Sequence, residues 1–203
     1  MAQHEPAVFV VDDDTAVRDS LALLLRSVDL KSEAYSSANE FLDAYDATRP
    51  GCLVLDVRMQ GMSGLELQQE LDKLHSTLPI IFLTAHGDVP MAVTAVKAGA
   101  VDFIQKPFRD QDLIDKIQHA IEEDARIRKM LADRQQILTR IESLTPREHE
   151  VMEMVVDGKA NKVIAIDLGL SQRTVEIHRA RVMQKMGADS VSQLVQMVMR
   201  VQQ

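Results

Sequence analysis

Five polar residues of the sequence follow directly on short apolar runs. They are Asp12, Asp13, Asp56, Thr84 and Lys106. If the apolar runs are parallel strands, these side chains meet at the carboxyl edge of the sheet, where open α/β sheets bind ligands. Three carboxylates in one crevice repel one another unless a cation lies among them, and oxygen ligands of this kind suit Mg2+. A carboxylate beside Mg2+ can attack a phosphoryl group while Lys106 and Thr84 donate to its oxygens, so the pattern predicts a site for phosphoryl chemistry.

The first 120 residues alternate short apolar runs with helix-period segments, which is the pattern of a parallel sheet covered by helices. The predicted strands are 7–11, 31–35, 52–55, 80–83 and 102–104. The predicted helices are about 15–27, 38–47, 64–75, 90–98 and 111 onward, with Asp14 and Ser37 as N-caps. The second strand is the most polar and is therefore expected at an edge. The prediction is a flavodoxin-like (βα)5 α/β domain with a five-stranded parallel sheet over residues 1–121.

A long helix is predicted beyond this domain. No glycine or proline occurs between Pro107 and Pro146, so the helix is expected to run through a linker at residues 122–142. Positions spaced four and three residues apart from Ala120 onward form a heptad seam, which the charged residues Asp124 and Arg134 interrupt. Two alternatives remain open, a coiled coil and a solvated linker helix that packs one face on either domain.

Residues 143–203 carry the start and stop signals of four helices. Thr145, Pro146 and Glu148 form a capping box with proline at the first helical position, and Gly158 ends this helix. The next three helices are predicted at about 161–168, 171–186 and 190–201, with a tight turn at Gly169 and Leu170 between the first two of these. This spacing predicts an all-α, four-helix domain with a helix-turn-helix.

Charge and cysteine content narrow the function classes. Residues 1–122 hold 10 basic and 20 acidic side chains, whereas residues 143–203 hold 8 and 7. An acidic first domain repels nucleic acid, while a near-neutral tail with its bases gathered in one helix can approach it. Cys52 is the only cysteine, so an internal disulfide and a zinc cluster are excluded. No leader and no apolar run of bilayer length is seen, which predicts a cytoplasmic protein with no membrane partner.

The motifs VFVVDDD, CLVLDVRMQGMSG, IIFLTAH and DFIQKPF together resemble the receiver domains of two-component response regulators over about residues 5–121. The resemblance implies Asp56 as phosphoacceptor and Lys106 as a ligand of the phosphoryl group. It implies a magnesium site made by Asp12, Asp13, Asp56 and the backbone carbonyl of Arg58. It also implies Thr84 with Phe103 as a switch pair, with Phe103 where tyrosine is common, and a cis peptide bond before Pro107.

The segment LTPREHEVMEMVVDGKANKVIAIDLGLSQRTVEIHRARVMQKM resembles the LuxR-type helix-turn-helix, and the whole layout resembles the FixJ group of regulators. Residues 163–166 depart from the pattern, because relatives usually place an acidic residue and a second charge there. The resemblance implies that a sensor histidine kinase phosphorylates Asp56, that the protein then forms a homodimer, and that it binds a two-fold DNA operator to regulate transcription. RNA polymerase is a further expected partner.

Two other functions are weighed against this one. Aspartyl-phosphate hydrolases share the nucleophile, threonine, lysine and Mg2+, but they need a general acid two residues after the nucleophile, where this chain has Arg58. We therefore expect no turnover enzyme, only phosphotransfer and self-dephosphorylation. A DNA-binding regulator that works without phosphorylation is the second alternative, and the acidic pocket argues against it.

Helical phase predicts which residues of the third tail helix read DNA. At about 100° per residue, one side carries the core-facing residues Val175, His178, Val182 and Met186. The expected base readers are Glu176, Ile177 and Arg181. The expected phosphate contacts are Lys162, Arg173, Thr174, Arg179 and Lys185. As an alternative, Glu176 serves only to orient a neighbouring arginine.

Overall fold

The computed structural model describes residues 5–85, 95 and 99–202, and the chain divides into two compact units, residues 1–128 and 129–203. Each unit has its own hydrophobic core. The helix predicted at 90–98 lies outside the described residues. Among the described residues, no helix combines the length and apolar character needed to cross a lipid bilayer.

The first unit is built on a parallel five-stranded sheet with the strand order β2-β1-β3-β4-β5. Its strands are β1 (Ala7–Val11), β2 (Ser32–Tyr35), β3 (Gly51–Leu55), β4 (Ile80–Thr84) and β5 (Asp102–Gln105). Every residue of β1, β3 and β4 is buried, whereas the edge strands β2 and β5 are partly exposed. The predicted parallel sheet is confirmed, including the polar strand at an edge.

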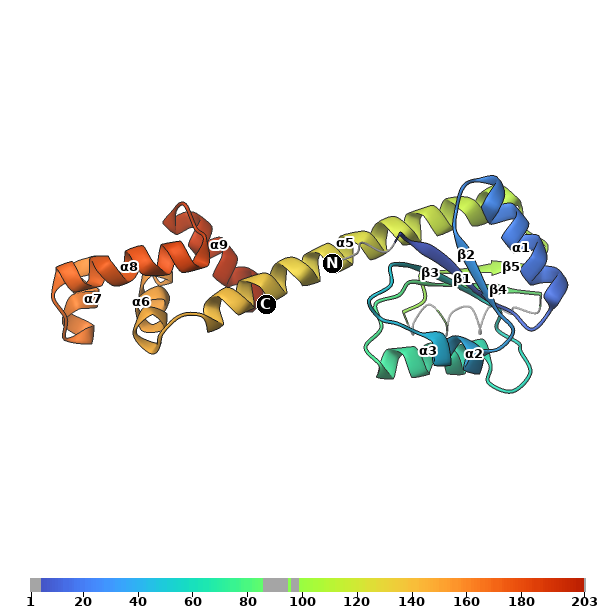
Figure 1. The fold of residues 1–203 in the computed structure, drawn as a ribbon, viewed down its shortest axis with the longest axis horizontal. Helices are drawn as coiled ribbons and strands as arrows, with labels where there is room; N and C mark the ends of the chain where they lie inside the picture. Colours follow the sequence, from blue (N-terminus) through green and yellow to red (C-terminus); the bar gives the residue numbers. More distant parts are fainter. Residues whose placement is uncertain (1–4, 86–94, 96–98, 203) are drawn as a thin grey trace. The chain divides into compact units, whose positions relative to one another are not determined.

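Helices cover both faces of this sheet (Figure 1). On one face, α1 (Thr15–Ser27) and the first turns of α5 (Asp110–Glu142) pack against the side chains of β1, β3 and β4. On the other face lie α2 (Ala38–Ala44) and α3 (Gly64–Lys73). Asp14 caps α1 and Ser37 caps α2, as predicted. The caps and the apolar helix faces together fix where each strand stops.

Two glycines allow backbone segments to approach closely near the strand ends. At Gly51 the backbone has φ of 148°, and a Cβ atom there would lie 1.9 Å from the Ala7 carbonyl oxygen. At Gly64, in the first turn of α3, a Cβ atom would lie 2.2 Å from the Asp56 carbonyl oxygen. Only glycine fits at either position. The close packing of α3 at Gly64 holds the backbone of Asp56 in place.

The helix α5 contributes to both cores. The Asp124 carboxylate is buried in the first unit, where it accepts hydrogen bonds from the Gly51 N–H (2.9 Å) and the Arg128 guanidinium (2.8 Å). Ile137 is buried in the second core, and Ile141 packs against that core. We expected residues 122–142 to form one linker, but both of its ends pack into a unit. The reason is tertiary, because Gly51, one of the two partners of Asp124, lies 73 residues away in the sequence.

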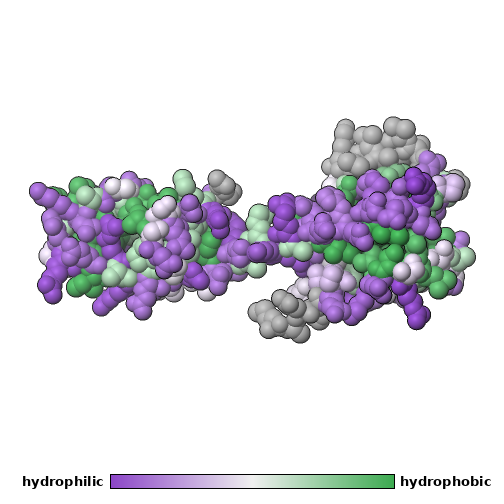
Figure 2. Space-filling view, turned by 90° about the horizontal axis from the view of Figure 1, so that it is seen from above, coloured by the Kyte–Doolittle hydropathy of each residue, from purple (hydrophilic) through white to green (hydrophobic). Residues whose placement is uncertain are grey.

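The second unit is a four-helix domain, as predicted. Its helices after α5 are α6 (Pro146–Val156), α7 (Asn161–Leu168), α8 (Gln172–Met186) and α9 (Val191–Gln202). Thr145 and Glu148 form the predicted capping box, and Gly169 ends α7 in the left-handed conformation (φ 65°). Ser171 caps α8. Figure 2 shows a mainly hydrophilic surface with apolar patches, and the exposed apolar side chains of this unit include Val163, Ile166 and Ile177.

Candidate functional site

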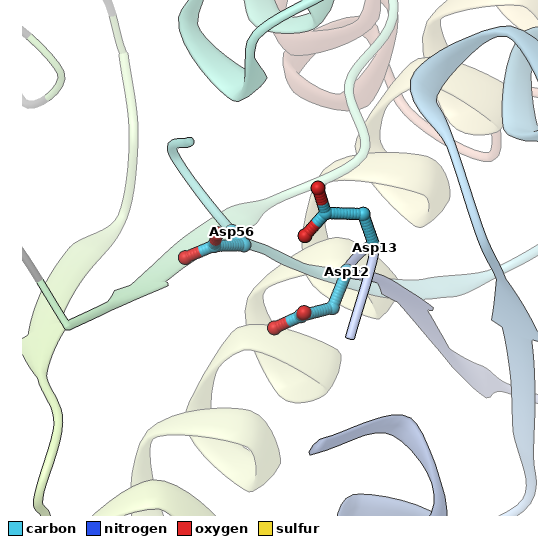
Figure 3. A group of neighbouring side chains, drawn as sticks. All are labelled: Asp12, Asp13 and Asp56. Atoms are coloured by element: carbon cyan, nitrogen blue, oxygen red, sulfur yellow. The ribbon is translucent and has the colours of Figure 1, made fainter. Parts of the chain in front are cut away.

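Three carboxylates converge where β1 and β3 end. Asp12 and Asp13 follow β1, Asp56 follows β3, and one oxygen from each lies within 4.8 Å of the others. Figure 3 shows the three side chains directed into the same space. Asp12 is 3% exposed and the Asp56 side chain 11% exposed, whereas Asp13 is open to solvent. The cluster therefore has a buried floor and an open mouth.

Lys106 brings a positive charge to this cluster from the loop after β5. Its Nζ atom lies 2.8 Å from Asp12 Oδ2 and 3.9 Å from Asp56 Oδ1. The Lys106 N–H donates to the Thr84 carbonyl oxygen at 2.8 Å, which fixes the start of the loop against the end of β4. The peptide bond between Lys106 and Pro107 is cis, as the resemblance implied. One ammonium group thus faces three carboxylates.

The electrostatic balance of the cluster favours a bound cation. Burial raises the pKa of Asp56, the Lys106 charge lowers it, and the charges of Asp12 and Asp13 raise it further. A carboxylate with a raised pKa is one whose charged form lacks compensation. The clustered oxygens are hard ligands, and the exposure of Asp13 leaves room for water ligands. The cluster therefore has the donor set and the charge deficit of a divalent-cation site.

The remaining predicted residues of the first unit lie on β4, on β5 and in the loop after β3. Thr84, at the end of β4, is 1% exposed. Phe103 in β5 is half-buried, and its ring centroid lies 6.4 Å from that of Phe82. Arg58 follows Asp56 by two residues and has an exposed side chain, while the N–H of Gln60 in the same loop donates to Asp13 Oδ2 at 3.0 Å. The β3–α3 loop is thereby tied to the acidic cluster.

In the second unit, helix α8 presents the face that helical phase predicted. Val175, Val182 and Met186 are buried, and His178 is half-buried. The outward residues Arg173, Glu176, Ile177 and Arg181 are exposed, as is Lys162 on α7. Thr174 is half-buried, with its hydroxyl 2.8 Å from that of the cap residue Ser171. These exposed side chains form one polar and basic face with a single apolar member, Ile177.

Two of the residues expected to bind phosphates have partners inside the unit. Lys185 Nζ donates to Glu148 Oε2 at 2.7 Å and to the Ser143 carbonyl at 3.0 Å. Arg179 Nη1 donates to Asn161 Oδ1 at 2.8 Å. Glu148 is 3% exposed, and its hydrogen bonds from Lys185 and from Thr145 lower its pKa to about 2. Lys185 thus ties α8 to α6, and Arg179 ties α8 to the start of α7.

Sequence reasoning missed these internal partners and one further residue, Arg18 of α1. Its guanidinium donates to the Asp12 carbonyl oxygen at 2.7 Å and to Thr15 Oγ1 at 2.9 Å. Glu148 was recognised only as a capping residue, because no local pattern announces a partner 37 residues later. The signal available for Arg18 was its position one helical turn after the cap residue Asp14.

Comparison with known families assigns both units. The family of the response regulator receiver domain matches residues 8–118, and the luxR family of bacterial regulatory proteins matches residues 142–198. Each match covers most of the unit in which it lies. The receiver match includes the acidic cluster and Lys106, and the luxR match includes α6, α7 and α8.

Whole-chain relatives have the same two-part layout. The chain is 47% identical to nodulation protein W of Bradyrhizobium diazoefficiens over 97% of this chain and 86% of that protein. It is 46% identical to the transcriptional regulatory protein FixJ of the same species, over 95% and 94% of the two chains. The solved structure of the response regulator StyR has a TM-score of 0.90 at 44% identity, covering 97% of this chain and 99% of that one.

Proposed function

Because this chain belongs to the two-component response regulators that join a receiver domain to a LuxR-type DNA-binding domain, we propose that phosphorylation of Asp56 controls its binding to a specific DNA sequence. The chain is a two-component transcriptional regulator, and its two domains imply a kinase and DNA as partners. The observation that carries the proposal is the convergence of Asp12, Asp13, Asp56 and Lys106 on one open-mouthed cluster.

In the proposed transfer, a phosphohistidine of a sensor kinase is the donor. A carboxylate oxygen of Asp56 attacks phosphorus, the P–O bond forms as the P–N bond breaks, and the electron pair returns to the histidine nitrogen. Lys106 Nζ, 3.9 Å from Asp56 Oδ1, is placed to neutralise the phosphoryl oxygens as they arrive. The buried Thr84 hydroxyl at the adjacent strand end is the second proposed donor.

We propose Mg2+ as the cation of the acidic cluster. Asp12, Asp13, Asp56 and the carbonyl of Arg58 would hold it, and when bound it supplies charge neutralisation for the transferred group. The clustered carboxylates and the raised pKa of Asp56, caused first by burial, support this assignment. Asp12 Oδ2 accepts a hydrogen bond from Lys106 Nζ, and Asp12 Oδ1 accepts one from the Asp14 N–H, so the orientation of this carboxylate is already fixed.

For the DNA face we propose Glu176, Ile177 and Arg181 as base readers. Lys162, Arg173 and Thr174 are the proposed phosphate contacts. All except the half-buried Thr174 are exposed on α7 or α8, which supports the assignment. Arg179 and Lys185 are proposed to orient α8 rather than to bind phosphates, because each already donates to a partner within the unit.

Coupling between the two domains is proposed to proceed through dimerisation. A phosphoryl group bound by Thr84 and Lys106 would draw Thr84 inward and make room for the half-buried Phe103 ring, creating a self-complementary face. A homodimer then requires two half-sites about one helical turn of DNA apart, or a multiple of that distance. RNA polymerase is the proposed next partner of the DNA-bound dimer.

The decisive test compares wild type with Asp56→Asn, using acetyl phosphate and Mg2+ as the phosphodonor system. We expect wild type to gain the mass of one phosphoryl group and to bind its DNA more tightly, and Asp56→Asn to do neither. Asp72→Asn, an exposed acid on α3, is the matched control. A mass gain by Asp56→Asn at the wild-type rate removes Asp56 as the phosphoacceptor. If protein that carries no phosphoryl group binds the DNA as tightly as phosphorylated wild type, the result supports the phosphorylation-independent regulator instead.

A turnover phosphatase is the other function to be tested. Hydrolases with this set of residues use a general acid two residues after the nucleophile, and Arg58 at that place has no proton-donating carboxyl group. We propose that turnover is limited to phosphotransfer and self-dephosphorylation. Steady-state assays on small phosphate esters are expected to give no release beyond one equivalent per chain.

A further inference from the structure

The two terminal guanidinium nitrogens of Arg18 both donate hydrogen bonds to the segment from Asp12 to Thr15, which connects β1 to α1. Nη1 donates to the Asp12 carbonyl oxygen at 2.7 Å, and Nη2 donates to Thr15 Oγ1 at 2.9 Å. Its own N–H donates to the Asp14 carbonyl within the first turn of α1. A charge-assisted bond from a planar two-point donor restrains both distance and direction. The side chain is half-buried, so this bond is partly shielded from water.

We propose that Arg18 is a positioning residue that sets the affinity of the acidic cluster for its divalent cation. The inference rests on the proposed magnesium site and assigns a role to a residue outside it. Arg18 holds the peptide carbonyl that connects Asp12 to Asp13. Because the peptide unit is planar and rigid, holding this carbonyl fixes the direction in which the chain reaches Asp13.

The restraint is one of four that act on Asp12, whose own N–H also donates to the Tyr35 carbonyl oxygen at 3.3 Å. Asp12 Oδ1 accepts the Asp14 N–H at 2.9 Å, and Oδ2 accepts Lys106 Nζ at 2.8 Å. These two bonds orient the Asp12 side chain, while the bond from Arg18 orients its backbone. Asp13 is exposed, and its own restraint is the bond from the Gln60 N–H to Oδ2. Backbone orientation at Asp12 is therefore the means by which the first unit directs the Asp13 carboxylate toward Asp56 (Figure 3).

A positive charge near a cation site can also act by repulsion, and that role predicts the opposite result. If repulsion dominated, removal of Arg18 would tighten cation binding. The Arg18 charge also acts on Glu40 of α2, whose pKa is lowered first by hydrogen bonds from Ser36 and, in smaller part, by that charge. This second acid offsets part of the repulsion. We therefore expect positioning to outweigh repulsion.

The test measures equilibrium binding of Mg2+ to the full chain by calorimetry, with Mn2+ as a spectroscopic probe of the same site. Loss of a group that orients a metal ligand weakens affinity by about 10- to 100-fold, so we expect Arg18→Ala to raise the Mg2+ dissociation constant about 10-fold. Arg18→Lys keeps the charge but loses the fork, and we expect it to bind Mg2+ more weakly than wild type. The control is Arg26→Ala, an exposed arginine on the same helix, with unchanged affinity.

Phosphorylation by acetyl phosphate gives a second readout. We expect Arg18→Ala to raise the Mg2+ concentration for half-maximal rate by the same factor, while the rate at saturating Mg2+ stays within about 2-fold of wild type. Unchanged or tighter Mg2+ binding by Arg18→Ala overturns the inference. A second result also overturns the inference. If Arg18→Ala both binds Mg2+ more weakly and unfolds at a lower temperature than wild type, while Arg18→Lys shows neither change, Arg18 acts on folding and not on the cation site.

Failure of the inference and failure of the proposed function are distinguishable. If wild type binds Mg2+ and is phosphorylated on Asp56 while Arg18→Ala binds equally well, only the inference is lost. If wild type itself binds no Mg2+, the magnesium site is lost, and the inference with it.

Discussion

The acidic cluster of the receiver unit and the outward face of α8 are assembled in different ways. The cluster takes one or two residues from each of several strand ends, and its Lys106–Asp12 pair joins residues 94 positions apart. The proposed DNA face takes most of its residues from one helix, between Arg173 and Arg181. The proposed DNA face can therefore be predicted from helical phase along one segment of the sequence. The acidic cluster forms only when the sheet aligns several strand ends.

The two regions also treat their charges differently. In the cluster, one ammonium faces three carboxylates, and burial raises the pKa of Asp56. In the second unit, the buried Glu148 has Lys185 as a close partner, which lowers its pKa to about 2. The first arrangement leaves a deficit of positive charge that a divalent cation can fill. In the second arrangement, a basic side chain holds α8 against α6.

The largest expected effect on phosphorylation breaks the cluster at Lys106. Lys106→Met keeps the length of the side chain but removes the charge at 3.9 Å from Asp56 Oδ1. Because loss of one preorganised donor to a charged transition state costs about 10²- to 10³-fold, we expect phosphorylation by acetyl phosphate to slow by at least about 100-fold. The time course of intact mass measures this rate. Lys73→Met, at an exposed lysine on α3, is expected to keep the wild-type rate.

The next effect concerns the buried acid that joins α5 to the sheet. Asp124→Ala leaves the Gly51 N–H and the Arg128 guanidinium without their shared acceptor. Breaking a buried pair costs about 3–5 kcal/mol, so we expect a loss of this size in the unfolding free energy of the receiver unit. Tyrosine fluorescence during urea unfolding reports on this unit alone, because both tyrosines, Tyr35 and Tyr45, lie in it and the chain has no tryptophan.

Asp115→Ala is the control for this change. Asp115 is exposed on the same helix and accepts a hydrogen bond from Gln111. We expect this substitution to lower the unfolding free energy of the receiver unit by less than about 0.5 kcal/mol. Equal losses in Asp115→Ala and Asp124→Ala would show that the buried network contributes nothing specific.

A smaller effect separates the proposed DNA contacts Arg181 and Lys162 from Lys185, which has a partner within the second unit. Arg181→Ala is expected to cost about 1–3 kcal/mol of DNA binding and to relax the preference at one base position. Lys162→Ala should weaken binding to all DNA sequences by the same factor. It should also reduce the salt slope, which is the slope of log affinity against log salt concentration, by about one. Lys185→Met should leave the salt slope unchanged and lower the thermal stability, because its ammonium is bonded to Glu148. Binding to randomised half-sites at several salt concentrations measures all three.

If Lys185→Met changes the salt slope as much as Lys162→Ala does, Lys185 binds a DNA phosphate, as the sequence predicted. Arg200→Ala, at an exposed arginine near the end of α9 and outside the proposed face, serves as the control.

The smallest effects are opposite pH dependences of stability. The folded pKa of Glu148 is lowered from 4.5 to about 2, so its contribution is present above about pH 4.5 and is lost as the pH falls toward 2. The folded pKa of Asp56 is raised from 3.8 by burial, so its ionisation costs stability as the pH rises above that value. We expect Asp56→Asn to be more stable than wild type at neutral pH without Mg2+, and Glu148→Gln to be less stable.

Urea unfolding at several pH values measures these differences, with tyrosine fluorescence for the receiver unit and circular dichroism for the remaining transition. Added Mg2+ should erase the advantage of Asp56→Asn, since the cation compensates the wild-type carboxylate. An advantage that persists unchanged in saturating Mg2+ would place the cation elsewhere.

Much of the fold followed from local patterns. The alternation of apolar runs predicted five parallel strands with β2 at an edge, and the caps Asp14, Ser37 and Thr145 were found where the sequence placed them. The cap and turn signals of the tail predicted its four helices. These features are local because a cap or a hydrophobic period involves neighbours within a few residues.

The limits of the linker show where local patterns stop. The heptad pattern predicts Asp124 only as a charged residue that interrupts an apolar seam. In the structure this carboxylate is fully buried, because the Gly51 N–H and Arg128 supply its hydrogen bonds. The helical period places Arg128 four residues from Asp124, but it carries no information about Gly51, which only the fold brings to this carboxylate.

The sequence by itself determined the order of the elements, the strand ends that carry Asp12, Asp13, Asp56 and Lys106, and the outward side of α8. Tertiary structure alone decided which charges pair. It placed Lys106 on Asp12, Lys185 on Glu148 and Arg18 on the Asp12 carbonyl. The physical reason is range. Backbone propensity acts over one or two helical turns, whereas an ion pair forms only between groups that the packed core has already brought within a few ångströms.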